Sequence, residues 1–168
     1  MTKLFLASFL MVITSCGQAQ TSTFKSPKYN YTINKPSGFE QTTATGVHID
    51  YKVVNKTDGS SILVNVSNRQ PEERGIDAWN YSKEYFEKVF SYQDPVFVIS
   101  KAEKITIDGK KTFLLYYSYP SNGGTKLKVI EAYLFVGKNA YVITATSDEQ
   151  HYGEYKTVFL GTIKSMKF

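Results

Sequence analysis

The stretch Tyr141-Val142-Ile143-Thr144-Ala145-Thr146-Ser147 decides the fold, together with the helical pattern that follows it. It is predicted to be the β-strand that closes a meander. Ser147 or Asp148 can cap a helix, and the next apolar residues recur every three or four positions. They are Tyr152, Tyr155, Val158, Phe159 and Ile163. The chain is therefore expected to end in a strand and a helix that packs on the sheet.

Three more strands are predicted directly before this one, at residues 96–107, 112–119 and 126–136. The turn sequences Asp108-Gly109 and Gly137-Lys138-Asn139 separate them and are typical of hairpins. Hairpins connect antiparallel neighbours, so the second half of the chain predicts an antiparallel meander.

The first half of the chain predicts three shorter strands, at residues 29–33, 47–53 and 62–66. Each alternates between apolar and polar residues, and Asp58-Gly59 forms the turn between the last two.

A helix is predicted between the two groups of strands. Asp77 can cap it, and Pro95 follows it as a stop signal. Its apolar stripe, which we expect to face the core, consists of Trp79, Ser82, Tyr85, Phe86, Val89 and Phe90. Strands joined mainly by hairpins, with two helices, predict an α+β fold in which helices flank an antiparallel β-sheet.

The N-terminus predicts export. Lys3 precedes an apolar run at 4–13 that is too short for a spanning helix, so residues 1–15 are typical of a signal peptide. Cys16 is the only cysteine, and Ile13-Thr14-Ser15-Cys16 resembles the bacterial lipobox. We therefore predict that Cys16 is acylated and anchors the mature protein to a membrane. The alternatives are cleavage after Ala19, which gives a soluble periplasmic or secreted protein, and a buried N-terminal helix.

The mature chain is expected to form one domain. Residues 16–28 are predicted to be the lipidated cysteine and a flexible tether, because residues 18–26 are small, polar and without periodicity. Residues 29–168 are predicted to be a single folded unit. A hydrophobic content of 42% excludes a disordered chain. A formal net charge of +5 is too small to predict nucleic-acid binding.

Several segments, standing in order, resemble the PsbP-like domain family, which is named for an extrinsic protein of photosystem II. The strand and turn at 31–39 are similar to the opening of that family. The helix at 78–90 is followed by the strand Lys104 to Asp108, by Gly109 and by the aromatic strand 113–117. The most specific segment combines 141–146, a helix and Ile163-Lys164-Ser165-Met166.

This resemblance covers roughly residues 29–168 and implies a three-layer α-β-α sandwich. It also implies that relatives are mostly non-enzymatic assembly, adaptor or binding proteins, often exported or lipid-anchored in bacteria. Plant members associate with a metal cluster, but none of their binding residues can be matched to this sequence. The fold alone does not transfer a photosynthetic role.

Candidate chemistry is sparse. His48 and Asp50 share one strand face, and His151 and Glu154 share one helix face, so each pair is a weak metal or acid–base candidate. The commoner explanations are a solvated sheet face for the first pair and acidic residues that complement the helix dipole for the second. No nucleophile elbow, phosphate loop or zinc spacing occurs. We therefore expect no cofactor and no enzymatic activity.

Tyrosine is abundant, with 13 residues. Tyr116, Tyr117 and Tyr119 lie close together, with Tyr133 on a neighbouring predicted strand. Tyrosine suits protein interfaces because its ring gives contact area at low entropic cost, so these four form a candidate interface. Cross-strand aromatic pairs that stabilise the sheet are the alternative.

The leading hypothesis is an exported, lipid-anchored and non-catalytic binding or assembly module at a bacterial envelope membrane, with an envelope protein as its partner. The second hypothesis is a carrier of a small apolar or aromatic ligand held between sheet and helix. The third is a metal-dependent or hydrolytic enzyme that uses His48 or His151.

Overall fold

The computed structural model describes residues 22–93 and 97–168, so the predicted signal peptide, Cys16 and Pro95 lie outside the described residues. The elements of the first half are β1 (Ser22–Lys25), β2 (Thr32–Lys35), β3 (Glu40–Gln41), β4 (Ile49–Val54), β5 (Ser61–Asn68), the 3₁₀ helices η1 (Pro71–Glu73) and η2 (Ala78–Asn80), and α1 (Lys83–Gln93). Those of the second half are β6 (Val98–Ile107), β7 (Lys110–Pro120), β8 (Lys126–Val136), β9 (Asn139–Asp148) and α2 (Tyr152–Lys164).

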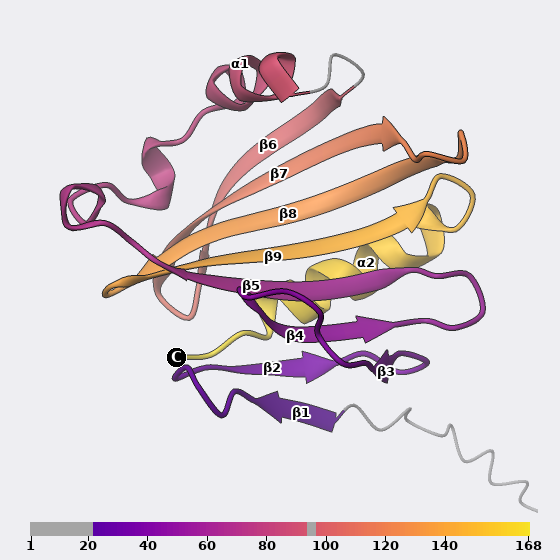
Figure 1. The fold of residues 1–168 in the computed structure, drawn as a ribbon, viewed down its shortest axis with the longest axis horizontal. Helices are drawn as coiled ribbons and strands as arrows, with labels where there is room; N and C mark the ends of the chain where they lie inside the picture. The colour runs from indigo at the N-terminus through magenta and orange to yellow at the C-terminus, as the bar shows by residue number, and fades with distance from the viewer. Residues whose placement is uncertain (1–21, 94–96) are drawn as a thin grey trace, which may run out of the picture.

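Seven strands form one antiparallel sheet in the order β3-β4-β5-β9-β8-β7-β6 (Figure 1). The predicted meander supplies β6 to β9, and β5 joins it by pairing with β9. Helix α1 lies on one face of the sheet and α2 lies on the other, which gives three layers. The predicted α+β fold, an antiparallel sheet flanked by helices, is confirmed.

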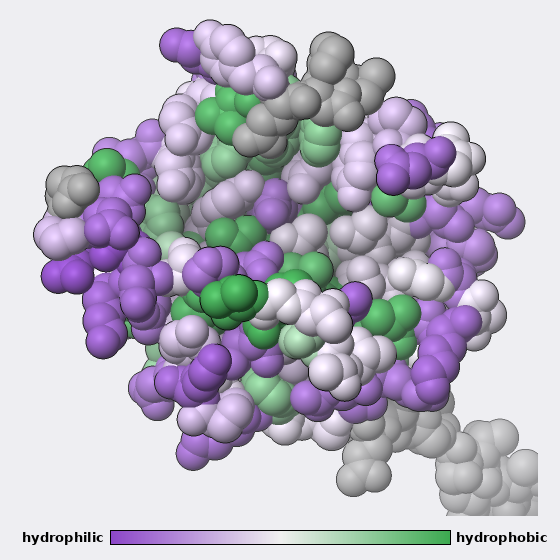
Figure 2. Space-filling view, viewed as in Figure 1, coloured by the Kyte–Doolittle hydropathy of each residue, from purple (hydrophilic) through white to green (hydrophobic). Residues whose placement is uncertain are grey.

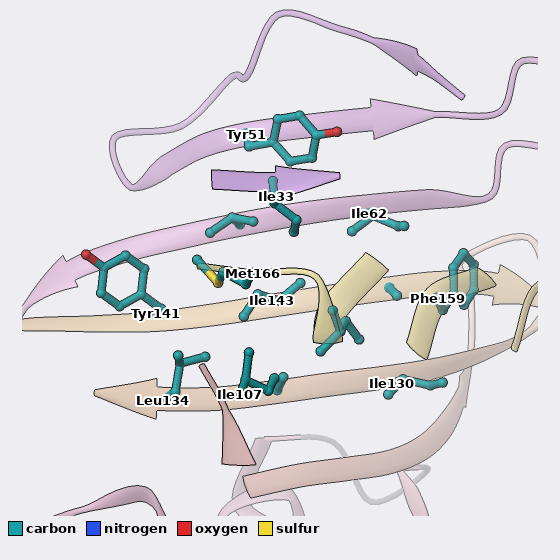
Figure 3. Close-up of a cluster of buried hydrophobic side chains, with 14 of the residues drawn as sticks. Ile33, Tyr51, Ile62, Ile107, Ile130, Leu134, Tyr141, Ile143, Phe159 and Met166 are labelled. Carbon is teal, nitrogen blue, oxygen red and sulfur yellow. The ribbon is translucent and has the colours of Figure 1, made fainter. Parts of the chain in front are cut away.

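Strand β7 carries core residues on both of its faces. Leu114 and Tyr116 belong to the larger core, which α2 closes with Phe159 and Ile163. Figure 3 shows part of this core, including Phe159. Alternate residues of β7 point the other way, so Phe113 packs in a second core beneath α1. Burial on both faces explains why the sequence of β7 is continuously apolar through the segment 113–117.

Part of the segment predicted to be a flexible tether belongs to the N-terminal hairpin. Ser22–Lys25 is not a linker but strand β1, which pairs with β2 along its whole length. The side chain of Phe24 lies 4.5 Å from Tyr51, measured between ring centroids, and packs on the larger core. The predicted tether, residues 16–28, therefore extends too far into the folded domain.

The end of the chain completes this hairpin. Thr32 and Lys167 exchange two backbone hydrogen bonds, of 2.9 and 3.0 Å, although one lies near the start of the domain and the other near its end. Phe168 donates its backbone N–H to Asp108 in the β6–β7 turn at 2.9 Å. Asp108 adopts φ 47° and Gly109 adopts φ 72°, as the predicted Asp-Gly hairpin turn requires.

The first helix is shorter than the sequence predicts. Asp77 accepts a hydrogen bond from the backbone of Trp79, but it caps η2, and α1 begins only at Lys83. Trp79 is half-buried and donates its indole N–H to the carbonyl of Ile105 at 3.1 Å. The predicted stripe is therefore wrong for Trp79, which does not share a helix with the buried Phe86.

The second helix also starts later than its predicted caps. It begins at Tyr152, and Asp148 instead accepts the backbone N–H of His151 at 2.8 Å. Phe159 and Ile163 are buried as predicted, whereas Val158 lies on the exposed side.

Candidate functional site

A groove of about 470 Å³ lies on the α1 side of the sheet. One wall is formed by the segment that carries η1 and η2 together with the start of α1, and the floor is formed by the strands β5, β8 and β9. Its lining consists of Ser67, Arg69, Glu73, Ile76, Asn80, Tyr81, Tyr85, Phe135 and Ala140. Small-molecule and peptide sites are typically clefts of this size with aromatic walls and few polar groups.

Arg69 fixes the wall of this groove. Its side chain is only 7% exposed, and Nη2 donates to the carbonyls of Glu73 and Ile76, the second at 2.6 Å. The guanidinium lies 4.1 Å from the ring centroid of Phe135 in the floor. A buried arginine that joins loop carbonyls to the sheet holds the loop in place, so the groove is preorganised.

The rim of the groove is aromatic and exposed. Tyr81 and Tyr85 stack with ring centroids 5.3 Å apart and planes at 19°. Tyr85 is 51% exposed, Ile76 is 46% exposed, and Tyr92, two helical turns along α1 from Tyr85, is 80% exposed. Figure 2 shows this face, on which apolar side chains lie among polar ones. We call Ile76, Tyr85 and Tyr92 the exposed ridge.

The sequence prediction missed this ridge because it placed Tyr85 in the buried stripe. The signal was present, since Tyr85 and Tyr92 are seven residues apart and therefore lie on one side of a helix. Among the α1 side chains that the structure describes, only Phe86 is fully buried, and it packs on Phe113 and Tyr133.

Two of the predicted interface tyrosines lie under α1 and form a polar network. The hydroxyls of Tyr117 and Tyr133 both donate to Glu131 Oε2, at 3.0 and 2.8 Å, and Thr144 donates to its other oxygen at 3.0 Å. The pKa of each of these two tyrosines is raised well above the ordinary value of a phenol. Burial is the larger cause, and the negative charge of Glu131 is the second. Both phenols therefore stay protonated and serve as donors.

The other two predicted tyrosines are separated from each other. Tyr116 is buried on the α2 side of the sheet and donates to Glu103 at 2.6 Å. Tyr119 lies on the α1 side and is half-buried, with its ring stacked on Phe97 at a centroid distance of 4.9 Å. The structure thus brings Tyr117, Tyr119 and Tyr133 to one face and Tyr116 to the other.

The histidine pairs have other partners in the structure. Asp50 accepts the hydroxyl of Tyr31 at 2.8 Å, and His48 lies exposed before β4. His151 pairs with Asp148 rather than Glu154, with Nδ1 2.8 and 2.9 Å from the two carboxylate oxygens. Across residues 22–93 and 97–168, no three His, Cys, Asp or Glu side chains converge as metal ligands would.

Lipid attachment at Cys16 falls outside the described residues and stays a prediction. None of the helices within the described ranges is long and apolar enough to cross a membrane.

The fold is similar to that of several solved structures. The structure is similar to cyanobacterial PsbP from Synechocystis sp. PCC 6803, with a TM-score of 0.67 and 14% identity over 94% of this chain and 97% of that chain. It is also similar to LpqN from Mycobacterium tuberculosis, a protein involved in cell envelope biogenesis, with a TM-score of 0.59 and 14% identity over 88% and 90% of the two chains.

A third similar structure is PA94 from Pseudomonas aeruginosa, a protein of unknown function described as a putative regulator. Its TM-score is 0.54 at 14% identity, over 86% of this chain and 94% of that chain. No protein-family model and no curated protein matches the sequence. At these identities the likeness concerns the fold, and the PsbP-like fold expected from the sequence is confirmed.

Proposed function

We propose that this PsbP-like domain is a non-catalytic binding module that is exported and held at a bacterial envelope membrane by acylated Cys16. Its partner is an envelope protein that presents apolar side chains to the exposed ridge and the adjoining groove. The signal-like residues 1–15 and the lipobox-like Ile13-Thr14-Ser15-Cys16 support the location. LpqN, which shares the fold, is itself involved in envelope biogenesis.

The observation that carries this proposal is the exposure of large apolar side chains beside a preorganised groove. Two of the three ridge residues, Tyr85 and Tyr92, are more than half exposed. Interfaces are enriched in tyrosine, and such anchors contribute most of the binding free energy when they fill a partner's pocket. A groove whose wall is already fixed by Arg69 loses little conformational entropy on binding.

The chemistry of the tyrosines supports binding over catalysis. The hydroxyls of Tyr116, Tyr117 and Tyr133 all donate to carboxylates, and burial raises the pKa of each. Such phenols are poor proton acceptors and poor nucleophiles near neutral pH, where catalytic groups need a pKa close to the working pH.

Site-specific photocrosslinking in the native membrane tests the proposal. p-Benzoylphenylalanine replaces Tyr85 in one strain and Tyr92 in another, and it replaces Val158, 37% exposed on α2, as the matched control. We expect both ridge positions to crosslink the same discrete protein, and Val158 to give no such adduct. The same adduct at all three positions, or none at Tyr85 and Tyr92, would refute the ridge as the contact.

A second candidate function is transport of a small aromatic or apolar ligand, and the volume of the groove favours it. The space directly between α1 and the sheet is filled, because Phe86 stacks on Phe113 with ring centroids 5.6 Å apart. The open volume of about 470 Å³ lies beside that packing and is lined by Tyr81, Tyr85 and Phe135. Native mass spectrometry of the protein purified from its own membrane distinguishes the two, because a carrier retains a bound small molecule.

A further inference from the structure

A second pocket, of about 320 Å³, lies on the opposite face of the sheet from the groove, between the ends of β6, β7 and β8 and the first turns of α2. The strand register creates it: Lys101 lies opposite Tyr116, and Ser118 lies opposite Lys128. Side chains of paired residues point to the same face. Its side-chain lining includes Lys101, Tyr116, Lys126, Lys128, Tyr152 and Lys156.

The lysines of this pocket outnumber the acids that pair with them. Lys101 pairs with Glu103 at 2.7 Å. Lys126 and Lys128 share a single carboxylate, that of Glu149, at 3.1 Å each. Lys156 makes no ion pair with any described residue, so the four ammonium groups meet two carboxylates and two positive charges stay in excess.

Two of the ammonium groups are held over tyrosine rings. Lys101 Nζ lies 5.4 Å from the ring centroid of Tyr116, and Lys128 Nζ lies 5.5 Å from that of Tyr152. Each ring attracts the cation above its face, which restricts the long lysine side chain before any ligand arrives. Burial raises the pKa of Tyr152, so its phenol stays protonated and can donate a hydrogen bond to an anion.

From these contacts we infer that the pocket binds the phosphate group of a small organophosphate. Lysine binds phosphate as a concentrated point charge, and a tyrosine hydroxyl adds a directed donor. The volume lies at the lower end of the range for small-ligand sites, which suits a phosphate that carries a glycerol-sized group. Such a group occurs both in soluble phosphomonoesters and in the headgroups of anionic phospholipids.

Lysine acetylation footprinting of the full-length protein, purified from its native membrane, tests this inference. In the first arm, sn-glycerol 3-phosphate is added to the protein in neutral detergent. In the second arm, the protein is inserted into vesicles of phosphatidylglycerol with phosphatidylcholine, or of phosphatidylcholine alone. Mass spectrometry measures the acetylation rates of Lys128 and Lys156, with Lys138 in the exposed β8–β9 turn as the internal reference.

We expect acetylation of Lys128 and Lys156 to slow several-fold while that of Lys138 is unchanged. Protection by the soluble phosphomonoester identifies a soluble ligand, and protection only by phosphatidylglycerol identifies a lipid headgroup. Equal rates in all conditions, or equal slowing of Lys138, would overturn the inference.

Charge-matched variants separate the pocket from general attraction to anions. Lys128→Gln combined with Lys156→Gln is expected to abolish the protection of Lys126 by whichever anion protects the wild type. Lys25→Gln combined with Lys110→Gln removes the same charge elsewhere, leaves the Lys138 reference in place and is expected to preserve the protection. Circular dichroism confirms that both variants are folded. Equal loss in both variants would show diffuse attraction and refute a pocket.

The arm with sn-glycerol 3-phosphate does not depend on Cys16 acylation or on the exposed ridge, so its result is independent of the proposed function.

Discussion

The hydroxyl of Tyr155 in α2 donates to Asp58 Oδ2 at 2.7 Å, joining the second helix to the β4–β5 turn across 97 positions of sequence. Asn55, in the same turn, donates its side-chain amide to that hydroxyl at 2.7 Å. One phenol oxygen therefore ties α2 to the hairpin β4–β5, which lies outside the meander.

This relationship predicts a pH-dependent contribution to stability. The hydrogen bond to Asp58 raises the pKa of Tyr155 to about 12, above the ~10 expected in the unfolded chain. The contribution is therefore complete below pH ~10 and is lost as the pH rises towards 12. Tyr155→Phe is expected to lower the free energy of unfolding by about 1–2 kcal/mol at neutral pH.

Urea unfolding of the wild type and the variant at pH 7 and across the alkaline range measures this difference. Tyr92→Phe is the control, because Tyr92 is 80% exposed. A difference between wild type and Tyr155→Phe that stays constant up to pH 12 would contradict the assignment.

The packing of α1 gives a second prediction. Phe86→Ala is expected to lower the free energy of unfolding by ~3–5 kcal/mol, because it empties a site enclosed by Phe113 and Tyr133. Tyr92→Ala, at a position of the same helix that is 80% exposed, is expected to change it by no more than ~0.5 kcal/mol. Chemical denaturation measures both values, and equal losses would show that α1 is docked in a different rotation.

The third prediction concerns His151. Its hydrogen bond with Asp148 raises the pKa of His151, so the interaction stabilises the fold below pH ~6.5 and is lost as the pH rises through the raised value. NMR titration of the imidazole is expected to give a midpoint above ~6.5, which Asp148→Asn lowers. Glu154→Gln is expected to have the smaller effect, because Glu154 acts only through its charge. The reverse order would refute the pairing.

Removal of both histidines gives the fourth prediction. The variant His48→Ala with His151→Ala is expected to keep its fold, its membrane location and its crosslinked partner. His48 is exposed, and the hydrogen-bonding needs of His151 are met by Asp148. A folded double variant that loses the partner would instead support the metal or acid–base hypothesis.

The fifth prediction concerns the membrane anchor. Cys16→Ser removes the only thiol that can be acylated, so the protein is expected to leave the membrane fraction while its domain stays folded. Immunoblotting of fractions after a high-salt wash measures the release. A processed Cys16→Ser protein that stays in the pellet would show that acylation is not the anchor.

Prediction from sequence succeeded where a local pattern is sufficient. The strand predicted at 141–147, which the structure has as β9, and the Asp108-Gly109 turn both depend on neighbouring residues, and both were identified. The strand at residues 22–25, which the sequence analysis assigned to the tether, was not predictable. This segment, β1, is mostly polar and becomes a strand only by pairing with β2. Tertiary pairing determines the structure of such a segment, and its composition does not.

Prediction of the candidate site was limited by the same cause. Tyr117 and Tyr133 were identified, but Glu131, which accepts both hydroxyls, was not, because their meeting depends on the register of β7 with β8. The groove was also missed. Its wall exists because α1 begins at Lys83, four residues after Trp79, which is the first apolar position of the predicted helix. The helical period of the sequence alone does not determine where the helix begins.

The bridge between Thr32 and Lys167 has a consequence for the biogenesis of the protein. The second strand cannot complete its backbone pairing until Lys167, 135 positions further along the chain, has left the ribosome. For an exported chain Lys167 must also have cleared the translocation channel. The N-terminal hairpin is therefore among the first segments synthesised and the last to be locked, an order opposite to the domain-by-domain folding that usually begins at the N-terminus.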